Sequence, residues 1–359
     1  MKKTIICAVL LLFELHPLNA QEHRPLNIIM MIGDGMGVAQ VTAGRTKKGR
    51  LELEKFRHVG LLLTNAYGPD YIEDSAAGAT ALSTGVATRN GMIGMGPDSL
   101  ALETVLERAQ KLGKKTGIVV SCSITHATPA SYVAHVPSRS MHLEIALQIA
   151  NAESDLYLGS GWGWFLPKEL GGRRTDGRDL LAAMRKRGYT VVLSDSAFRA
   201  SKPSKNSKII GLFAEDHVGT AQIRKPGLAE LTSHALATLS GESGFFLLVE
   251  GSQIDWAGHD NKSDQIMEEM ADFDDAIGMV LNFAKKNPET LVIVTADHET
   301  GGYAIIDGSS GEKTVRGGFV TEHHTGAMVP LFAMGPGAEQ FTGIRPNSDV
   351  GMILLKMLE

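Results

Sequence analysis

The sequence predicts an α/β protein with a mostly parallel central sheet and helices on both of its faces. Short apolar runs alternate with longer amphipathic stretches along the whole chain. Strands of a parallel sheet are covered on both faces, so they are apolar along their length. Strands with one solvent-exposed face instead alternate between apolar and polar residues. Glycine accounts for 40 residues and clusters in turns, which favours a fold with many tight strand–helix junctions.

Each expected strand is a short run of aliphatic, β-branched or aromatic residues bounded by polar residues or glycine. In chain order these runs cover residues 27–33, 59–64, 116–121, 155–159, 189–193, 208–213, 244–251, 290–297 and 328–335. The stretches between them predict helices near 36–48, 75–84, 101–112, 140–152, 177–187, 227–240, 262–286 and 347–358. Loops that follow the strands of such a sheet gather along one edge, so residues far apart in the sequence can meet there.

The amino-terminal residues 1–20 combine two lysines, an apolar run and a small residue at Ala20. This pattern predicts a secretory signal peptide; a buried amino-terminal helix is the alternative. The apolar run is too short to span a bilayer as a mature helix. We therefore expect a periplasmic or secreted protein without a membrane anchor, in which residues 21–359 form a single catalytic domain.

Composition and charge narrow the class of protein. The chain has 359 residues, of which 43% are hydrophobic, and this is ordinary for a globular protein with a large core. A net charge of −5 gives no electrostatic reason to bind nucleic acid or an anionic membrane. Cys7 lies in the predicted signal peptide, so Cys122 is alone in the mature chain and is expected to be a small buried apolar side chain.

Carboxylates and imidazoles follow the ends of several expected strands. An acid beside a histidine also occurs in solvated turns, but burying many carboxylates at one sheet edge without cations would be strongly unfavourable. The mixture of carboxylate and imidazole groups suits Zn²⁺. The residues are Asp34 after 27–33; Glu250, Asp255 and His259 around the end of 244–251; Asp297 and His298 at the end of 290–297; and His323 and His324 before 328–335.

These donors divide into separate candidate metal sites. Asp255 and His259 are four residues apart and share one face if this stretch is helical. A hydroxyl such as that of Thr128 is of the type that completes an Mg²⁺ shell. The candidate sites are Asp255 and His259 with one histidine of the 323–324 pair; Asp34 with Asp297 and His298; and, for Mg²⁺, Thr128 with Asp34 and Glu250.

Ser75 is the candidate nucleophile. It begins the predicted helix 75–84, where free N–H groups and the helix dipole favour an anion; a plain helix N-cap is the alternative. The chain has no G-x-S-x-G elbow, so a metal bound to the serine oxygen would replace the general base. Arg139 has a planar fork that suits two oxygens of a phosphate, although a solvated surface arginine is the simpler interpretation of this residue alone.

The motifs "IGDGMG", "EDSAAGATALSTG", "THATPASYVAH", "VPSR", "VEGSQIDWAGH", "TADHETGG" and "HHTG" together resemble the successive motifs of the alkaline phosphatase family. The resemblance runs from about residue 27 to residue 350 and is weakest in 160–240 and 303–320. It implies phosphate monoester hydrolysis with an alkaline pH optimum, a homodimer, and a short crown-type insertion near 300–322.

The resemblance also assigns roles to individual residues. It implies two Zn²⁺ ions and one Mg²⁺ ion, with Ser75 attacking phosphorus to form a phosphoserine that water then hydrolyses. Arg139 would clamp the phosphoryl oxygens and Asp74 would orient Arg139. The implied ligands are Asp255, His259 and His324 for one zinc; Asp34, Asp297 and His298 for the other; and Asp34, Thr128 and Glu250 for magnesium.

Two residues near the expected site depart from the best-known bacterial pattern of the family. His126 stands where some members have an aspartate near magnesium. The histidine removes an anion from the surroundings of that ion and would therefore weaken its retention. Trp256 stands where others have lysine or histidine, and its indole N–H can donate to an oxyanion or a water. The alternatives are a phosphodiesterase or another transferase of the same metal-dependent superfamily, and an exported metal- or phosphate-binding protein without catalysis.

Overall fold

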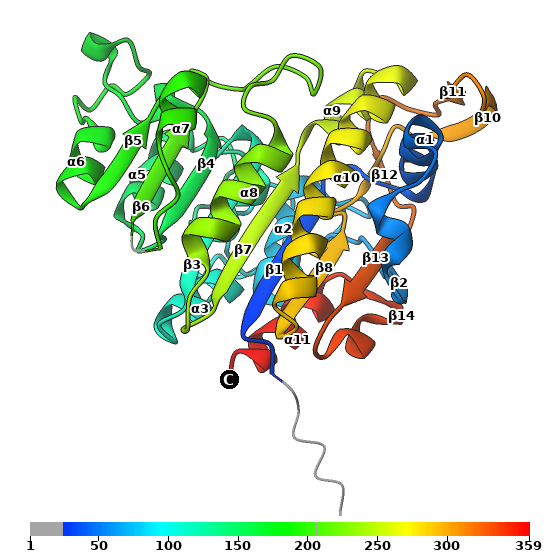
Figure 1. Cartoon of the computed structure of the whole chain (residues 1–359), viewed down its shortest axis with the longest axis horizontal. Helices are drawn as coiled ribbons and strands as arrows, with labels where there is room; N and C mark the ends of the chain where they lie inside the picture. Colours follow the sequence, from blue (N-terminus) through cyan, green and yellow to red (C-terminus); the bar gives the residue numbers. More distant parts are fainter. Residues whose placement is uncertain (1–23, 206) are drawn as a thin grey trace, which may run out of the picture.

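The computed structural model describes residues 24–205 and 207–359, and its centre is a single 10-stranded sheet (Figure 1). The strands are β1 (Asn27–Gly33), β2 (His58–Leu63), β3 (Lys115–Ser123), β4 (Leu156–Ser160), β5 (Tyr189–Val192), β6 (Lys208–Leu212), β7 (Phe245–Gly251), β8 (Thr290–Thr295), β13 (Val329–Met334) and β14 (Gly343–Pro346). They lie in the order β14-β2-β13-β8-β1-β7-β3-β4-β6-β5. Only β13 runs antiparallel to its neighbours, β2 and β8, so the predicted α/β class is confirmed.

Helices cover both faces of the sheet, as the sequence predicts. Figure 1 shows α8 (Leu228–Leu239) and α10 (Ser263–Lys286) in front of the sheet, and α10 also packs against α1 (Val38–Lys48). The other face carries α2 (Ser75–Thr84), α3 (Val105–Lys111), α4 (Ala127–Ala130) and α11 (Ser348–Met357). The 24-residue α10 buries apolar residues at helical spacing, as expected for a helix with one face on the core, and it also buries Glu269 and Asp274.

The register of the central strands sets the position of the site. β1 pairs in parallel with β7 on one side and with β8 on the other. Gly33 lies opposite Gly251, and Ile32 lies opposite Thr295, so the three strands end at nearly the same level. All three strands are buried along their length. The residues that follow them are therefore brought to one sheet edge, although they come from three distant parts of the chain.

Several elements were not expected from the sequence. β14 is short and mostly exposed, so it has no apolar run that would mark it as a strand. The helices α4 and α7 (Asp195–Ala200) are each short. Residues near 300–322, expected as a short crown-type insertion, contain the hairpin of β10 (Ala304–Ser309) and β11 (Thr314–Gly318), which pairs outside the central sheet.

The predicted signal peptide, residues 1–20, lies outside the described residues. In the part of the chain that the structure describes, none of the helices has the length and apolar character needed to cross a membrane.

Candidate active site

The first group of side chains that could hold a metal ion joins α9 (Gln253–His259) to β12 (His324–Thr325). Asp255 and His259 lie one turn apart on α9, and the His259 Nε2 to Asp255 Oδ2 distance is 3.3 Å. His324 Nε2 lies 3.1 Å from His259 Nε2 and 3.6 Å from Asp255 Oδ1. Two nitrogen or oxygen ligands of one tetrahedral zinc ion are separated by about 3.3–3.5 Å, given their bond lengths. The three side chains are thus spaced to share one cation, whereas the neighbouring His323 is exposed.

The second group follows β1 and β8 and is completely buried. His298 Nε2 lies 3.5 Å from Asp34 Oδ1 and 3.3 Å from Asp297 Oδ2. Both carboxylate oxygens of Asp34, and Oδ2 of Asp297, have no hydrogen-bond partner among the described residues. Burying such oxygens unpaired costs several kcal/mol on the order-of-magnitude scale for buried ions, and a cation removes that cost. The donor set and these unpartnered oxygens fit a divalent ion.

Close backbone approach lets these groups meet. Gly35 has a φ of +73°, and a Cβ atom at this position would lie 2.7 Å from the Cα atom of Asp255. Gly78 on α2 faces Asp297, whose Cβ atom would be only 2.9 Å from a Cβ placed at residue 78. Glycine at both positions therefore allows the loop after β1, α9 and α2 to converge around the two groups of ligands.

The outward nitrogen of each cluster histidine is held by an oxygen. His324 Nδ1 lies 3.0 Å from the backbone oxygen of Glu73, and His259 Nδ1 lies against the backbone oxygen of Glu322. His298 Nδ1 lies 3.2 Å from Thr300 Oγ1. When each Nδ1–H donates to its oxygen, the Nε2 lone pair points into the cluster, which is the arrangement typical of metal-ligating histidine.

Thr300 is a site residue that the sequence analysis missed. It lies on β9 (Glu299–Thr300), whose pairing with β12 places it opposite His324. Its hydroxyl donates to Asp255 Oδ1 and lies within hydrogen-bond distance of His298 Nδ1, so it joins one ligand from each group. The rings of His298 and His324 also stack, with centroids 3.5 Å apart. No spacing signal in "HETGG" could have revealed these contacts.

Burial and mutual charge perturb the titration of these groups when no cation is present. Burial, together with the charge of Asp297, raises the pKa of Asp34 well above its ordinary value. Burial and the charge of Asp255 raise the pKa of Asp297 to about 6. Burial lowers the pKa of His298 to about 4, and burial and the neighbouring His298 lower that of His324 to about 4. Divalent cations would reverse the carboxylate shifts, because they favour ionised oxygen ligands.

Ser75 begins α2 and faces the second group. Its Oγ atom lies 3.2 Å from His298 Nε2, and the residue is buried. The N-cap of α2 is Asp74, whose side chain accepts a hydrogen bond from the backbone N–H of Ala77. The alternative that Ser75 is only a helix N-cap is therefore wrong, and its hydroxyl is directed to the metal-ligating groups at the positive end of the helix dipole.

Arg139 is held by an ion pair next to Ser75. Its Nη1 atom donates to Asp74 Oδ2 at 3.0 Å, and its Nη2 atom lies 3.3 Å from His126 Nε2. Burial alone would raise the pKa of Asp74, but the charge of Arg139 and hydrogen bonds from backbone N–H groups outweigh it and lower that pKa. The Arg139 side chain as a whole is 30% exposed.

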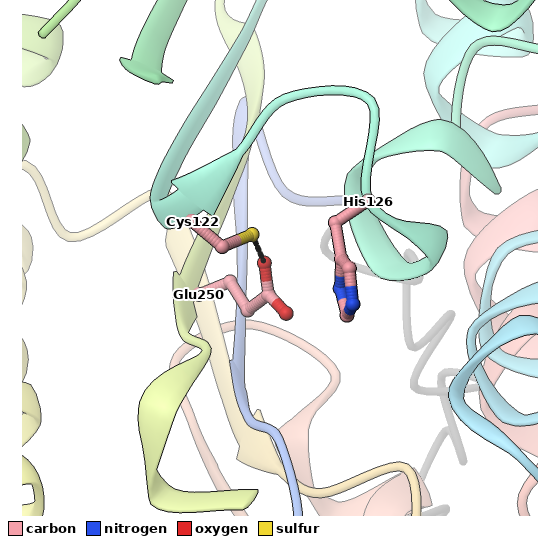
Figure 2. A group of neighbouring side chains, drawn as sticks. All are labelled: Cys122, His126 and Glu250. Atoms are coloured by element: carbon pink, nitrogen blue, oxygen red, sulfur yellow. Dashed lines mark hydrogen bonds between the residues drawn. The ribbon is translucent and has the colours of Figure 1, made fainter. Parts of the chain in front are cut away.

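A third group lies at the ends of β3 and β7 and is drawn in Figure 2. Glu250, the penultimate residue of β7, faces Cys122 of β3, and Cys122 Sγ lies 3.6 Å from Glu250 Oε2. His126, just before α4, completes the group, and Thr128 lies within α4. Burial raises the pKa of Glu250 to about 8 and lowers that of His126 to about 3. Cys122 is buried as expected, but it faces a carboxylate and is not surrounded by apolar side chains alone.

Trp256 lies next to this group, where its ring contacts two histidine rings. Its ring meets His126 edge-on with centroids 6.1 Å apart, and it meets His217 at 4.7 Å. His217, which the sequence analysis did not single out, accepts a hydrogen bond from the backbone N–H of Ser123. His217 comes from the stretch 160–240, where the family resemblance is weakest.

The sequence of residues 26–317 matches the family model described as alkaline phosphatase. The chain belongs to the alkaline phosphatase family. Alkaline phosphatase 4 of Bacillus subtilis is 33% identical, over 93% of this chain and 88% of its own length. The alkaline phosphatase of Escherichia coli is also 33% identical, over 90% of this chain and 84% of its own length.

Solved structures agree with this membership. The alkaline phosphatase from the Antarctic bacterium TAB5 superposes with a TM-score of 0.84 and 37% identity, covering 93% of this chain and 98% of its own. A solved variant of that enzyme, with one histidine replaced by glutamate, has Mg bound in its M3 site. As a member of this metal-dependent family, the chain is an enzyme that hydrolyses phosphate monoesters.

Proposed function

We propose that this alkaline phosphatase works through a phosphoserine on Ser75 at a centre with two zinc ions. The observation that carries the proposal is the position of Ser75 Oγ, 3.2 Å from His298 Nε2 at the junction of the two groups of ligands. Asp255, His259 and His324 would hold one ion, and Asp34, Asp297 and His298 the other. When bound, the zinc ions would supply Lewis acidity that favours the ionised serine oxygen and stabilises charge on the leaving oxygen.

The side chains of the protein account for the geometry of the reaction. Arg139, held by Asp74, would bind two phosphoryl oxygens with its planar fork and keep phosphorus in line with Ser75. The Ser75 oxygen forms a bond to phosphorus while the ester oxygen leaves as the alcohol. In the second step a water attacks the phosphoserine, and the Ser75 hydroxyl and inorganic phosphate are released. The N-terminal N–H groups of α2 favour negative charge at this position throughout.

The resemblance implies Mg²⁺ among Asp34, Thr128 and Glu250. The oxygens Thr128 Oγ1 and Glu250 Oε1 have no hydrogen-bond partner among the described residues and are suitable donors for such an ion. The thiol of Cys122 and the imidazole of His126 lie in the same group, however, and do not suit Mg²⁺. The donor set as a whole therefore does not fit magnesium, and we assign no step of the reaction to it.

The test is to trap and locate the covalent intermediate. The zinc-loaded enzyme is mixed with a ³²P-labelled aryl phosphate monoester, quenched in acid and digested, and we expect the label on the peptide that contains Ser75. Ser75→Ala should lose the label and on the order of 10³-fold or more of kcat. Ser83→Ala, in the same buried helix, is the matched control and should retain the label. Label that survives in Ser75→Ala would contradict the proposal.

Substrate class, cellular location and assembly follow from the same proposal. We expect faster hydrolysis of an aryl phosphate monoester than of the matching diester, because Arg139 beside the nucleophile suits two free phosphoryl oxygens. Export with removal of residues 1–20, a single catalytic domain over 21–359 and a homodimer remain predictions. Amino-terminal sequencing of the exported chain and light scattering in solution check the processing and the assembly.

A further inference from the structure

The loop between β6 and α8 brings His217 to the edge of the candidate active site. The backbone directly after His217 is held by Gln253, whose Nε2 atom donates to the backbone oxygens of Val218 at 3.1 Å and Gly219 at 3.2 Å. Gln253 begins α9, the helix that also carries Trp256. The loop is therefore tied to this helix, and His217 has a defined position beside it.

A buried ion pair holds the same loop farther along the chain. The guanidinium of Arg224 pairs with the carboxylate of Glu269 on α10, and the two side chains are only 1% and 2% exposed. The Glu269 carboxylate also accepts a hydrogen bond from the backbone N–H of Ala221 at 2.7 Å. These anchors do not involve the side chain of His217, so a substitution at residue 217 leaves them in place.

The imidazole of His217 contacts three residues next to the site. Its Nδ1 atom accepts a hydrogen bond from the backbone N–H of Ser123 at 3.1 Å. Its ring meets that of Trp256 with centroids 4.7 Å apart at 80°, and that of His126 at 5.9 Å and 82°. The rings of His126 and Trp256 are inclined to each other by 79°. The three rings are thus mutually edge-on, which is an arrangement that aromatic pairs prefer.

His126 connects these rings to Arg139. Its Nε2 atom lies 3.3 Å from Arg139 Nη2, and its backbone N–H donates to the backbone oxygen of Ser123 at 2.9 Å. The other terminal nitrogen of Arg139, Nη1, donates to Asp74. Because Asp74 fixes one side of the guanidinium, the position of the His126 ring limits how the other side can turn.

We propose that His217 is a positioning residue for phosphate binding. Its ring keeps the rings of Trp256 and His126 in place, and His126 keeps the Arg139 guanidinium turned toward two phosphoryl oxygens. A purely structural role is the competing explanation, in which His217 matters only because it accepts the hydrogen bond from Ser123. The inference rests on the proposed function in that Arg139 is the residue that binds the phosphoryl oxygens.

Two substitutions separate the ring of His217 from its hydrogen bond. In His217→Asn the amide oxygen can still accept from the Ser123 N–H, but the ring is lost. In His217→Phe the ring is kept, but the acceptor is lost. We expect His217→Asn to weaken the binding of inorganic phosphate to the zinc-loaded enzyme about 3–10-fold, measured by titration calorimetry. His217→Phe should keep the phosphate affinity and lower the melting temperature, because the buried Ser123 N–H loses its partner.

Kinetics and fluorescence distinguish a positioning role from a structural one. For an aryl phosphate monoester, kcat/KM of His217→Asn should fall by the same factor as the phosphate affinity, while kcat changes less than about twofold. The tryptophan emission of His217→Asn should shift to the red as Trp256 becomes more exposed, and this shift should be absent in a Trp256→Phe chain. His234→Asn is the control, because the His234 ring packs on Phe198; its phosphate affinity should be unchanged.

Two results would overturn the inference: an unchanged phosphate affinity in His217→Asn, or a loss of affinity in His217→Phe as large as that in His217→Asn. If His217→Phe fails to fold, the double variant His217→Asn/Trp256→Phe decides. The free-energy loss of phosphate binding in the double variant should be smaller than the sum of the two single losses, because the two rings act as a unit. An additive loss would contradict the positioning role.

The proposed function is judged separately, by the label on Ser75. A labelled Ser75 together with an unchanged phosphate affinity in His217→Asn rejects the positioning role and leaves the phosphoserine mechanism intact. Weakened phosphate binding in His217→Asn, with no label on Ser75 in the unsubstituted enzyme, rejects the phosphoserine mechanism and leaves the positioning role intact.

Discussion

The Ser75 hydroxyl oxygen lies 3.2 Å from Nε2 of His298, although the two residues are 223 positions apart in the chain. The contact depends on a parallel sheet, since His298 follows β8 while Ser75 begins a helix on one face of that sheet. His298 Nε2 also lies 3.5 Å from Asp34 Oδ1. One imidazole nitrogen thus lies close to both the proposed nucleophile and buried carboxylates, which is where a cation would have its largest effect on the serine oxygen.

The adjacent histidines 323 and 324 provide a matched pair for zinc binding. His324 lies within 3.1 Å of His259 in the first group, whereas His323 is exposed. We expect His324→Ala to lower the zinc content by one ion per chain and to reduce the rise in melting temperature that zinc causes. His323→Ala should change neither quantity. Equal zinc content in the two variants, measured by mass spectrometry, would contradict the assignment of His324.

Thr300→Val tests the hydroxyl that joins the two groups. Removing its contacts with Asp255 and His298 should weaken zinc affinity about 10–100-fold, the usual effect of losing a residue that orients metal ligands. Thr295→Val is the control, because Thr295 is equally buried but its hydroxyl donates only to the backbone oxygen of Pro330. That variant should lose about 1 kcal/mol of stability and keep its zinc affinity. Competition with a chelator measures both affinities.

Asp74→Asn separates two roles of one carboxylate. The amide oxygen of asparagine can still accept from the Ala77 N–H, so the N-cap of α2 is kept. The charged hydrogen bond to Arg139 is lost, and we expect phosphate to inhibit about tenfold less tightly, with a comparable fall in kcat/KM. Thermal unfolding should change little. Unchanged inhibition by phosphate would show that Asp74 does not position Arg139.

Chelated protein should lose stability as the pH rises from about 6.5 to 8. Burial raises the pKa of Glu250 to about 8 from an ordinary 4.5, and its hydrogen bond to Asp255 raises that of His259 to about 9 from 6.5. The folded state therefore binds more protons than the unfolded state in this interval, and the free energy of unfolding must fall with pH. The lowered pKa values of His298 and His324, about 4, act in the opposite sense only below 6.5.

Denaturant unfolding at several pH values measures this dependence. With zinc bound, the slope should be smaller, because the cations keep the carboxylates ionised and His259 neutral. Glu250→Gln should flatten the slope of the chelated protein, since it removes one of the groups that titrate. A free energy of unfolding that rises with pH over this interval in the chelated protein would contradict the prediction.

Local sequence patterns were sufficient to predict most of the side chains that the structure brings together as candidate ligands. Asp255 and His259 could be assigned together because their spacing of four residues places them on one helical face. Asp34, Asp297 and His298 could be assigned because each follows an apolar run that forms a buried strand. Thr300 and His217 could not, because a hydroxyl or an imidazole in a loop has no periodic pattern to mark its partner.

The sequence by itself determined the α/β class and the chemical types that gather at the sheet edge, since hydrophobic period and residue chemistry are local properties. Only the tertiary structure decided which donors lie close enough to share an ion. The proximity of these donors depends on β1, β7 and β8 ending at nearly the same level and on the register of β3 with β7. Cys122 shows the difference most clearly, because an apolar run does not reveal that its sulfur faces Glu250 from a neighbouring strand.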